Sequence, residues 1–235
     1  MMALRMFAQS FNTLFMTFRY FVFDVPHKGL RNGLSQFSLL AGRTDYSNPQ
    51  QVATLHQVGR EIFLFLNSHA SDENNVSLAE LEKRAPNTSK HITDDHEEIH
   101  QFQSELENLL ERLHADENID KMSEGKKFYD RLNIFHAAYL KHMTVEDGEI
   151  QDLLWDNFSD EELMAHRNQI MGTMQPQTLL VMFKYIIAAL SPAERIGLLR
   201  GFKTNAPEPF FNQSLDVIRP TLAQAEWDAL MDGLA

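Results

Sequence analysis

The sequence contains no cysteine among its 235 residues. Disulfides, iron–sulfur clusters, thiolate zinc sites and thiol-based catalysis are therefore excluded. A metal site in this chain must use imidazole and carboxylate donors, and ten histidines and 33 acidic residues are present to supply them. The absence of disulfides is compatible with a reducing compartment, and we expect a cytoplasmic protein.

Long hydrophobic runs are also missing, since no stretch approaches the ~20 apolar residues that a membrane-spanning helix requires. Residues 1–23 are rich in Phe and Met, but polar side chains interrupt them and no small-residue cleavage site follows. They do not resemble a signal peptide, and we expect an amphipathic lead-in instead. The sequence therefore predicts no membrane partner.

Positive charge is scarce, because 21 Lys and Arg stand against 33 Asp and Glu and the net charge is −12. The imbalance lies in residues 70–162, which hold 24 acidic residues against nine basic ones. Such a surface repels a phosphate backbone, so we expect no nucleic-acid partner. We interpret the acidity as a solvated surface that favours solubility.

Strand-like alternation is nearly absent, and a hydrophobic content of 43% is enough to build a core. Four amphipathic helical patterns, the first opening at Asp24-Val25-Pro26, follow one another from residue 24 to residue 156. We therefore predict an all-α protein: a lead-in (1–23), an up–down four-helix bundle (24–156), and a C-terminal helical extension (157–235) packed on the bundle. Residues 71–92 break the helical pattern, and we expect a long, partly irregular connection there.

Three residue pairs at helical spacing distinguish the predicted bundle. They are His69 with Glu73, His96 with His100, and His142 with Glu146. Residues four apart lie on one face of a helix, about one turn from each other, so each pair can present two donors to one interior point. Three such pairs in a helical chain predict a metal held inside a bundle.

The motifs resemble those of the hemerythrin-like, HHE cation-binding family. The similarity covers residues 24–156 and rests on four segments in order: 27–31 (His-Lys-Gly-Leu-Arg), 69–73 (His-Ala-Ser-Asp-Glu), 95–99 (Asp-His-Glu-Glu-Ile) and 142–147 (His-Met-Thr-Val-Glu-Asp). Two features depart from the oxygen-carrying members. The final bridging carboxylate, Glu146, comes one residue earlier than their aspartate. The connection between the second and third helices spans about twenty residues, whereas theirs is short.

This resemblance implies a non-haem di-iron centre, oxo- or hydroxo-bridged, with five histidines and two bridging carboxylates. The implied ligands are His27, His69, Glu73, His96, His100, His142 and Glu146. His100 lies off the apolar stripe of its helix, so an exposed position is the alternative for it. His136 is about 120° from His142 around the helix and is not expected to bind metal.

Other site classes lack their motifs. A ferritin-like centre needs Glu-x-x-His motifs on two different helices, whereas Glu97-x-x-His100 and Glu111-x-x-His114 both lie in the third predicted helix. The chain has no Gly-rich phosphate loop and no serine nucleophile elbow.

The function implied by the resemblance is binding of iron together with O2, NO or peroxide, in a sensing, storage or buffering role. We favour binding over turnover. Two alternatives stay open: a di-iron enzyme that reduces peroxide, and a metal-stabilised scaffold for a protein partner. In the scaffold, Phe210, Phe211 and Trp227 of the extension would form the docking surface, although packing inside the protein is the favoured role for them.

Overall fold

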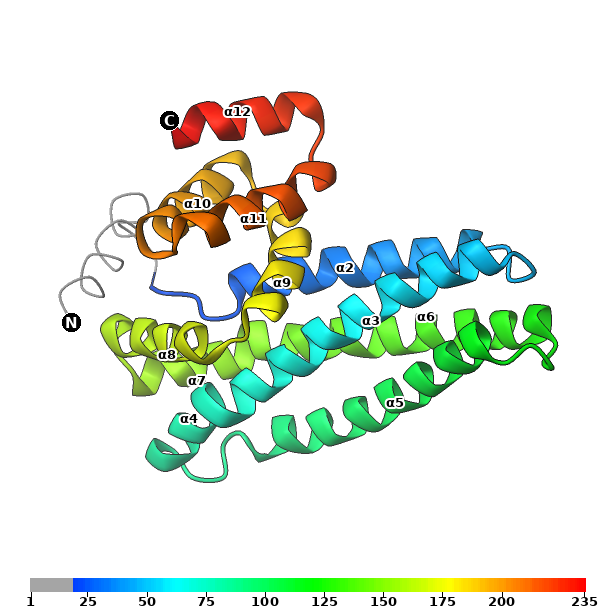
Figure 1. The fold of residues 1–235 in the computed structure, drawn as a ribbon. Coiled ribbons are helices and arrows are strands. Elements are labelled where there is room, and N and C mark those ends of the chain that lie inside the picture. Colours follow the sequence, from blue (N-terminus) through cyan, green and yellow to red (C-terminus); the bar gives the residue numbers. More distant parts are fainter. Residues whose placement is uncertain (1–18) are drawn as a thin grey trace. The chain divides into compact units, whose positions relative to one another are not determined.

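The computed structural model describes residues 19–235 (Figure 1), so most of the predicted lead-in, residues 1–18, lies outside the described residues. Regular structure from residue 19 onward is entirely helical, which confirms the all-α prediction. The chain divides into two compact units. The first unit is Leu30–Asn157, and the second unit is Phe158–Ala235 together with the N-terminal segment that ends at Gly29. None of the helices described from residue 19 onward has the length and apolar character needed to cross a membrane.

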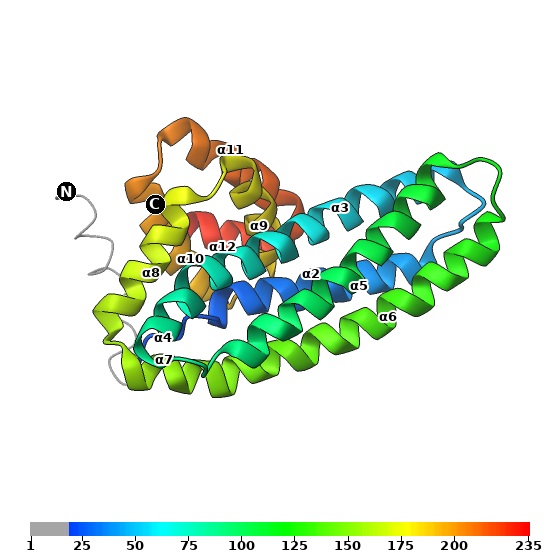
Figure 2. The ribbon, with the colours of Figure 1, turned by 90° about the horizontal axis from the view of Figure 1, so that it is seen from below.

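Long helices dominate the first unit. They are α2 (Asp24–Arg43), which belongs to this unit from Leu30 onward, α3 (Pro49–Asp72), α5 (Lys90–Ala115) and α6 (Lys121–Val145). Figure 2 shows them side by side, with the chain reversing direction from each to the next. The side chains of Asn48 and Asp120 accept hydrogen bonds from the first free backbone N–H groups of α3 and α6, which fixes where these two helices begin.

The core of the first unit is built from the apolar faces of these helices. Its most deeply buried members are Leu34, Phe37, Leu55, Ile62, Phe65, Leu106, Leu113, Phe128, Leu132 and Phe135. Phe37 contacts Phe63 and Phe128 edge-on, with ring centroids 5.6 and 5.9 Å apart. Each buried side chain of this size contributes about 1.5–3 kcal/mol, so the helices form a rigid frame.

Two helices change their winding partway along. Helix α3 continues into a π-helix, η1 (Glu73–Ser77), and then α4 (Leu78–Arg84). Helix α6 likewise continues into η2 (Glu146–Ile150) and then α7 (Gln151–Asn157). The predicted irregular connection at 71–92 is therefore wrong through Arg84, and only residues 85–89 are non-helical before α5 begins. A π-turn shifts the phase of the apolar residues, so the 3.6-residue pattern that predicts a helix is lost there.

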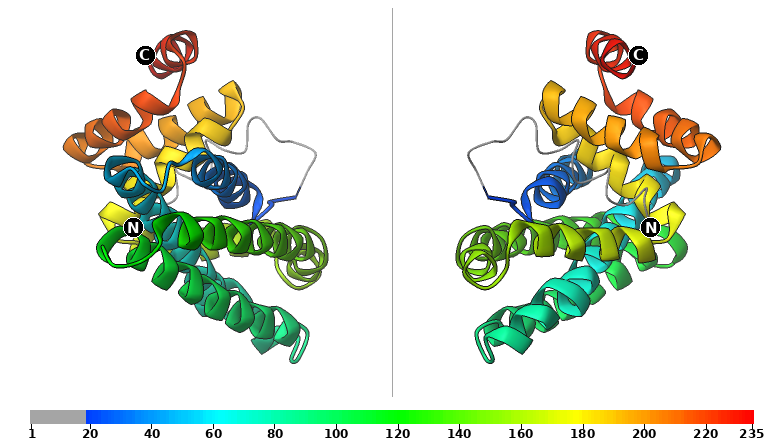
Figure 3. Two further views of the ribbon diagram at one scale, coloured as in Figure 1. Left: turned by 90° about the vertical axis from the view of Figure 1, so that its right-hand side faces the viewer. Right: turned by 90° about the vertical axis from the view of Figure 1, so that its left-hand side faces the viewer.

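The second unit is a set of shorter helices. They are α8 (Asp160–Thr173), α9 (Pro176–Ala189), α10 (Pro192–Asn205), α11 (Glu208–Ile218), the 3-10 turn η3 (Arg219–Thr221) and α12 (Gln224–Leu234). Helix α12, red in Figure 3, packs against α10. Phe202 contacts Phe183 and Phe210, with ring centroids 4.8 and 5.7 Å apart, and Phe211 is 6% exposed. These phenylalanines therefore pack within the second unit.

We predict that Gly59→Ala destabilises the first unit. A Cβ atom at Gly59 would lie 2.3 Å from Leu110 Cδ2 and 2.8 Å from Phe37 Cζ, and both of these side chains are buried. Such overpacking costs about 1–3 kcal/mol of unfolding free energy, measurable by urea denaturation. The control is Gly197→Ala, where a Cβ meets nothing within 4 Å, so a gain of about 0.5–1 kcal/mol is expected. Equal changes in the two variants would contradict this account of the packing.

Candidate metal centre

Six of the seven predicted ligands lie close together in the interior, each near the end of a helix or in the π-segment that follows it. They are His27 on α2, His69 on α3, Glu73 in η1, His96 on α5, His142 on α6 and Glu146 in η2. Each of the six is at most 6% exposed. The amphipathic period that buries the leucines and phenylalanines of these helices also turns the six polar residues inward.

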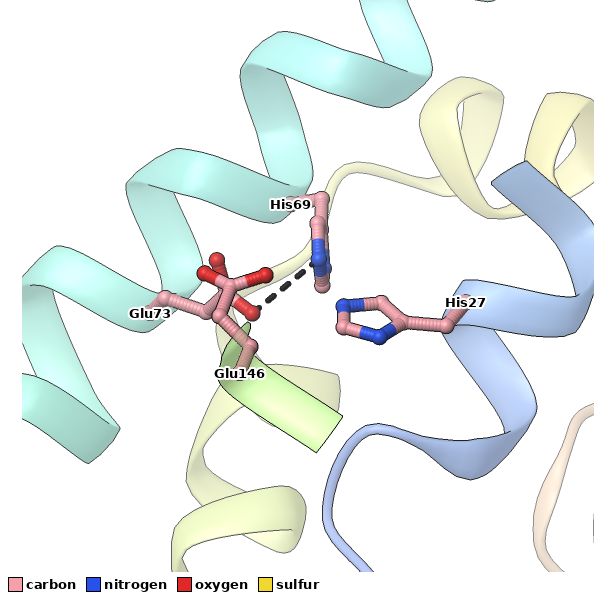
Figure 4. A group of neighbouring side chains, drawn as sticks. All are labelled: His27, His69, Glu73 and Glu146. Atoms are coloured by element: carbon pink, nitrogen blue, oxygen red, sulfur yellow. Dashed lines mark ion pairs between the residues drawn. The ribbon is translucent and has the colours of Figure 1, made fainter. Parts of the chain in front are cut away.

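The first donor group contains His27, His69, Glu73 and Glu146, which Figure 4 draws together. One donor atom from each residue lies within 4.8 Å of the others. His69 Nε2 is 3.0 Å from Glu73 Oε1. His27 stands in the first turn of α2, and because α2 is one uninterrupted helix to Arg43, the position of this turn follows from the rest of the helix.

The second donor group contains His96, His142 and Glu146, and its donor atoms also lie within 4.8 Å of one another. Glu146 Oε1 is 3.2 Å from His96 Nε2 and 3.0 Å from His142 Nε2. Glu73 reaches both groups as well, because its Oε1 faces His69 while its Oε2 lies 3.4 Å from His96 Nε2. Both carboxylates therefore lie close to histidines of both groups.

Both carboxylates occupy the same place in their helices. Glu73 and Glu146 are each the first residue of a π-helical segment, and each follows a histidine four residues earlier in the preceding α-helix. Single π-turns inside α-helices are rare and occur frequently at functional sites. The local winding, in addition to the spacing of four, therefore singles out these two positions.

The electrostatics of the metal-free cluster centre on His96. Burial alone would lower the pKa of this imidazole, but hydrogen bonds to Glu146 and Glu73 raise the pKa to about 9. A positive imidazolium then offsets the two carboxylates when no metal is bound. Burial, reinforced by the charges of Glu73 and Glu146, raises the pKa of the Tyr139 phenol well above its ordinary value, so this group stays protonated.

The residues present fit a metal cation. Both ring nitrogens of His142 are buried and form no hydrogen bond, although Nε2 is 3.0 Å from Glu146 Oε1. A short distance without hydrogen-bond alignment is expected of two groups whose lone pairs face a common point. Two carboxylates buried side by side are costly unless cations compensate them. Imidazole and carboxylate donors without thiolate suit iron and similar transition metals.

Two residues that the sequence did not single out lie behind the histidines. Asn74 Oδ1 is 2.9 Å from His96 Nδ1, and Asp95 Oδ2 is 3.8 Å from His142 Nδ1. Their only signal in the sequence is that each is the neighbour of a ligand, which gives no indication of where the side chain points. Glu149, three residues after Glu146, pairs with His91 at 3.2 Å, and its side chain is 58% exposed.

His100 and His136 stand apart from the cluster. His100 is exposed on α5 and belongs to neither donor group, so its role as a ligand stays a prediction. It lines a cavity of about 20 Å³ together with His96 and Tyr139. His136 is half-buried on α6 and also lies in neither group. Burial lowers the pKa of His136.

The chain is similar to one protein family and to several curated proteins. The sequence model described as the hemerythrin HHE cation-binding domain matches residues 20–154, more than half of the chain. F-box/LRR-repeat protein 5 of Danio rerio is 24% identical over 153 residues, which cover 64% of this chain and 22% of that protein. The same protein of Mus musculus is 22% identical over 153 residues, covering 64% and 21%.

A zinc finger protein BRUTUS-like of Arabidopsis thaliana is 22% identical over 181 residues, which cover 77% of this chain and 14% of that protein. The chain thus spans about a fifth or less of the length of these relatives. No solved structure matches the chain significantly.

We predict that Glu73→Gln and Glu146→Gln each lower the iron content more than His136→Ala does. An amide keeps the size of the side chain but loses the negative charge that a bridging ligand supplies, so a loss of about 10- to 100-fold in affinity is a lower bound for a direct ligand. Metal analysis after reconstitution measures the effect. Equal iron content in all three variants would contradict the assignment, and the same measurement on His100→Ala tests whether His100 is the fifth histidine ligand.

Proposed function

This chain belongs to the hemerythrin HHE cation-binding family, and we propose that its buried cluster holds a non-haem di-iron centre inside a four-helix bundle of α2, α3, α5 and α6. Membership in the family implies a bound metal cation. The observation that carries the di-iron proposal is the pair of donor groups that share Glu146. One ion with its own ligands would not require a second group of histidines on the far side of that carboxylate.

The proposed roles follow from the two groups. His27 and His69 hold one iron, His96 and His142 hold the other, and Glu73 and Glu146 bridge them. Bound iron would supply Lewis acidity, reversible redox chemistry and a coordination position for a small ligand. The helices around the cluster exclude water and hold the ligand side chains in fixed positions.

Tyr139 supports a ligand of few atoms. Its side chain is 2% exposed, and together with His96 it lines the cavity of about 20 Å³, which is room for roughly one water-sized molecule. Since burial keeps the phenol protonated, its O–H can donate a hydrogen bond to a molecule in that space. O2, NO and peroxide are of this size, whereas an organic substrate is not.

A binding role, in sensing, storage or buffering, is favoured over turnover. In the relatives the matched segment is about a fifth or less of a longer protein, which favours a module that reports on a bound ligand over a self-contained enzyme. Peroxide reduction would use the same site. The following measurement distinguishes it from reversible ligand binding.

We expect the purified, reconstituted protein to bind about two irons per chain, as the two donor groups imply. Its visible spectrum should change on exposure to O2, NO or peroxide. A spectrum that reverses under vacuum supports carriage, and sustained peroxide consumption that is lost with the metal supports the enzyme. Less than half an iron per chain after reconstitution would overturn the proposal. A metal-dependent rise in melting temperature with no spectral response would favour the scaffold.

We predict that Tyr139→Phe leaves the iron content unchanged but weakens ligand binding. Loss of one hydrogen bond costs about 1 kcal/mol, roughly fivefold in the Kd for NO or azide, followed by optical titration. Tyr46→Phe is the matched control, because the Tyr46 hydroxyl donates to the backbone oxygen of Ala41 and lies outside the cluster. An unchanged Kd in Tyr139→Phe would remove this phenol from the ligand site.

A further inference from the structure

Asn74 makes a contact that determines the protonation of a ligand. This residue follows Glu73 in η1, and its Oδ1 lies 2.9 Å from His96 Nδ1. An amide oxygen only accepts hydrogen bonds, so Nδ1 of His96 carries the proton and donates it to Asn74.

The opposite nitrogen of the same ring faces the cluster. His96 Nε2 is 3.2 Å from Glu146 Oε1 and 3.4 Å from Glu73 Oε2. A metal displaces the Nε2 proton of the imidazolium, and because Nδ1 keeps its proton toward Asn74, the neutral ring then presents the Nε2 lone pair. One amide oxygen therefore selects the nitrogen that is available to a metal between the two carboxylates.

We propose that Asn74 is a positioning residue that fixes the tautomer and ring orientation of His96 and thereby sets the metal affinity and reduction potential on the His96–His142 side of the site. This inference rests on the proposed function. Groups that orient a ligating histidine typically control metal affinity by about 10- to 100-fold.

Two further observations support the assignment. The ligand Glu73 and its neighbour Asn74 are consecutive in the π-helix η1, so one segment supplies a carboxylate to the cluster and an acceptor to the histidine opposite. Asn74 is itself exposed, whereas His96 is 6% exposed. The amide therefore stands where water would otherwise contact Nδ1, and it gives this nitrogen a partner of fixed direction.

The Asn74 amide is uncharged, and this affects the reduction potential of the bound iron. A carboxylate behind a ligating histidine makes the imidazole a more basic ligand, and a more basic ligand favours the higher oxidation state of iron. An amide polarises the ring less. Asn74 thus keeps the reduction potential of the iron at His96 higher than an aspartate at this position would.

The test uses the full chain with three variants: Asn74→Leu, Asn74→Asp and Asn75→Leu. Asn75 is the matched control, because it is the next residue of η1 and its amide donates to the backbone oxygen of Ser71, whereas the amide of Asn74 accepts from His96. The readouts are the Kd for Fe(II) by chelator competition, the reduction potential, and the melting temperature without metal.

We expect Asn74→Leu to weaken iron binding by about 10- to 100-fold, since it removes the acceptor at similar size. Asn74→Asp should restore the affinity and lower the reduction potential, and Asn75→Leu should change neither. A loss of apo melting temperature in Asn74→Leu with unchanged Kd would show a merely structural residue and overturn the inference. So would a wild-type potential in Asn74→Asp. If the wild-type chain itself binds no iron, the proposed function fails instead, and the two failures are thus distinguished.

Discussion

Two carboxylates buried beside each other are the constraint on which the rest of the first unit depends. Glu73 and Glu146 are 4% and 1% exposed, and a charge in such a place costs several kcal/mol unless it is compensated. The imidazoles around them are the compensation that the chain itself provides, with His96 protonated when no metal is present. The packed leucine and phenylalanine core keeps water out, which strengthens both the repulsion between the carboxylates and their attraction for a cation.

The π-helical turns connect this constraint to the backbone. Each carboxylate opens a π-segment, and each segment then returns to an α-helix, α4 or α7, whose buried residues hold its end in place. The weaker hydrogen-bond geometry of a π-turn is tolerated because the flanking helices are long and well packed. The π-turn that directs Glu73 inward also directs Asn74 toward α5. This one segment therefore supplies a candidate metal ligand, Glu73, and the hydrogen-bond acceptor that orients another, His96.

The sequence predicts the long helices of the first unit except beyond Asp72, where the chain stays helical through Arg84. Its spacing of four also predicts which side chains share a helix face, because that direction does not depend on the tertiary fold. The sequence was insufficient where direction depends on how one helix is rotated against another. His96 and His100 share that spacing, yet the structure buries the first and exposes the second. The contact of Asn74 with His96 could not be predicted for the same reason. It joins two different helical segments, so no periodic pattern in the sequence indicates it.

The donor count bears on what such a site is for. In the proposed di-iron centre, four histidines and two shared carboxylates would give each ion about four protein donors, and iron commonly takes more. Structural metal sites are closed by the protein, whereas functional sites keep a position for another ligand. The cavity of about 20 Å³ beside His96 and His100 has room for about one small molecule, with the protonated phenol of Tyr139 on its wall. A site that served only to stabilise the bundle would have no need of such a space.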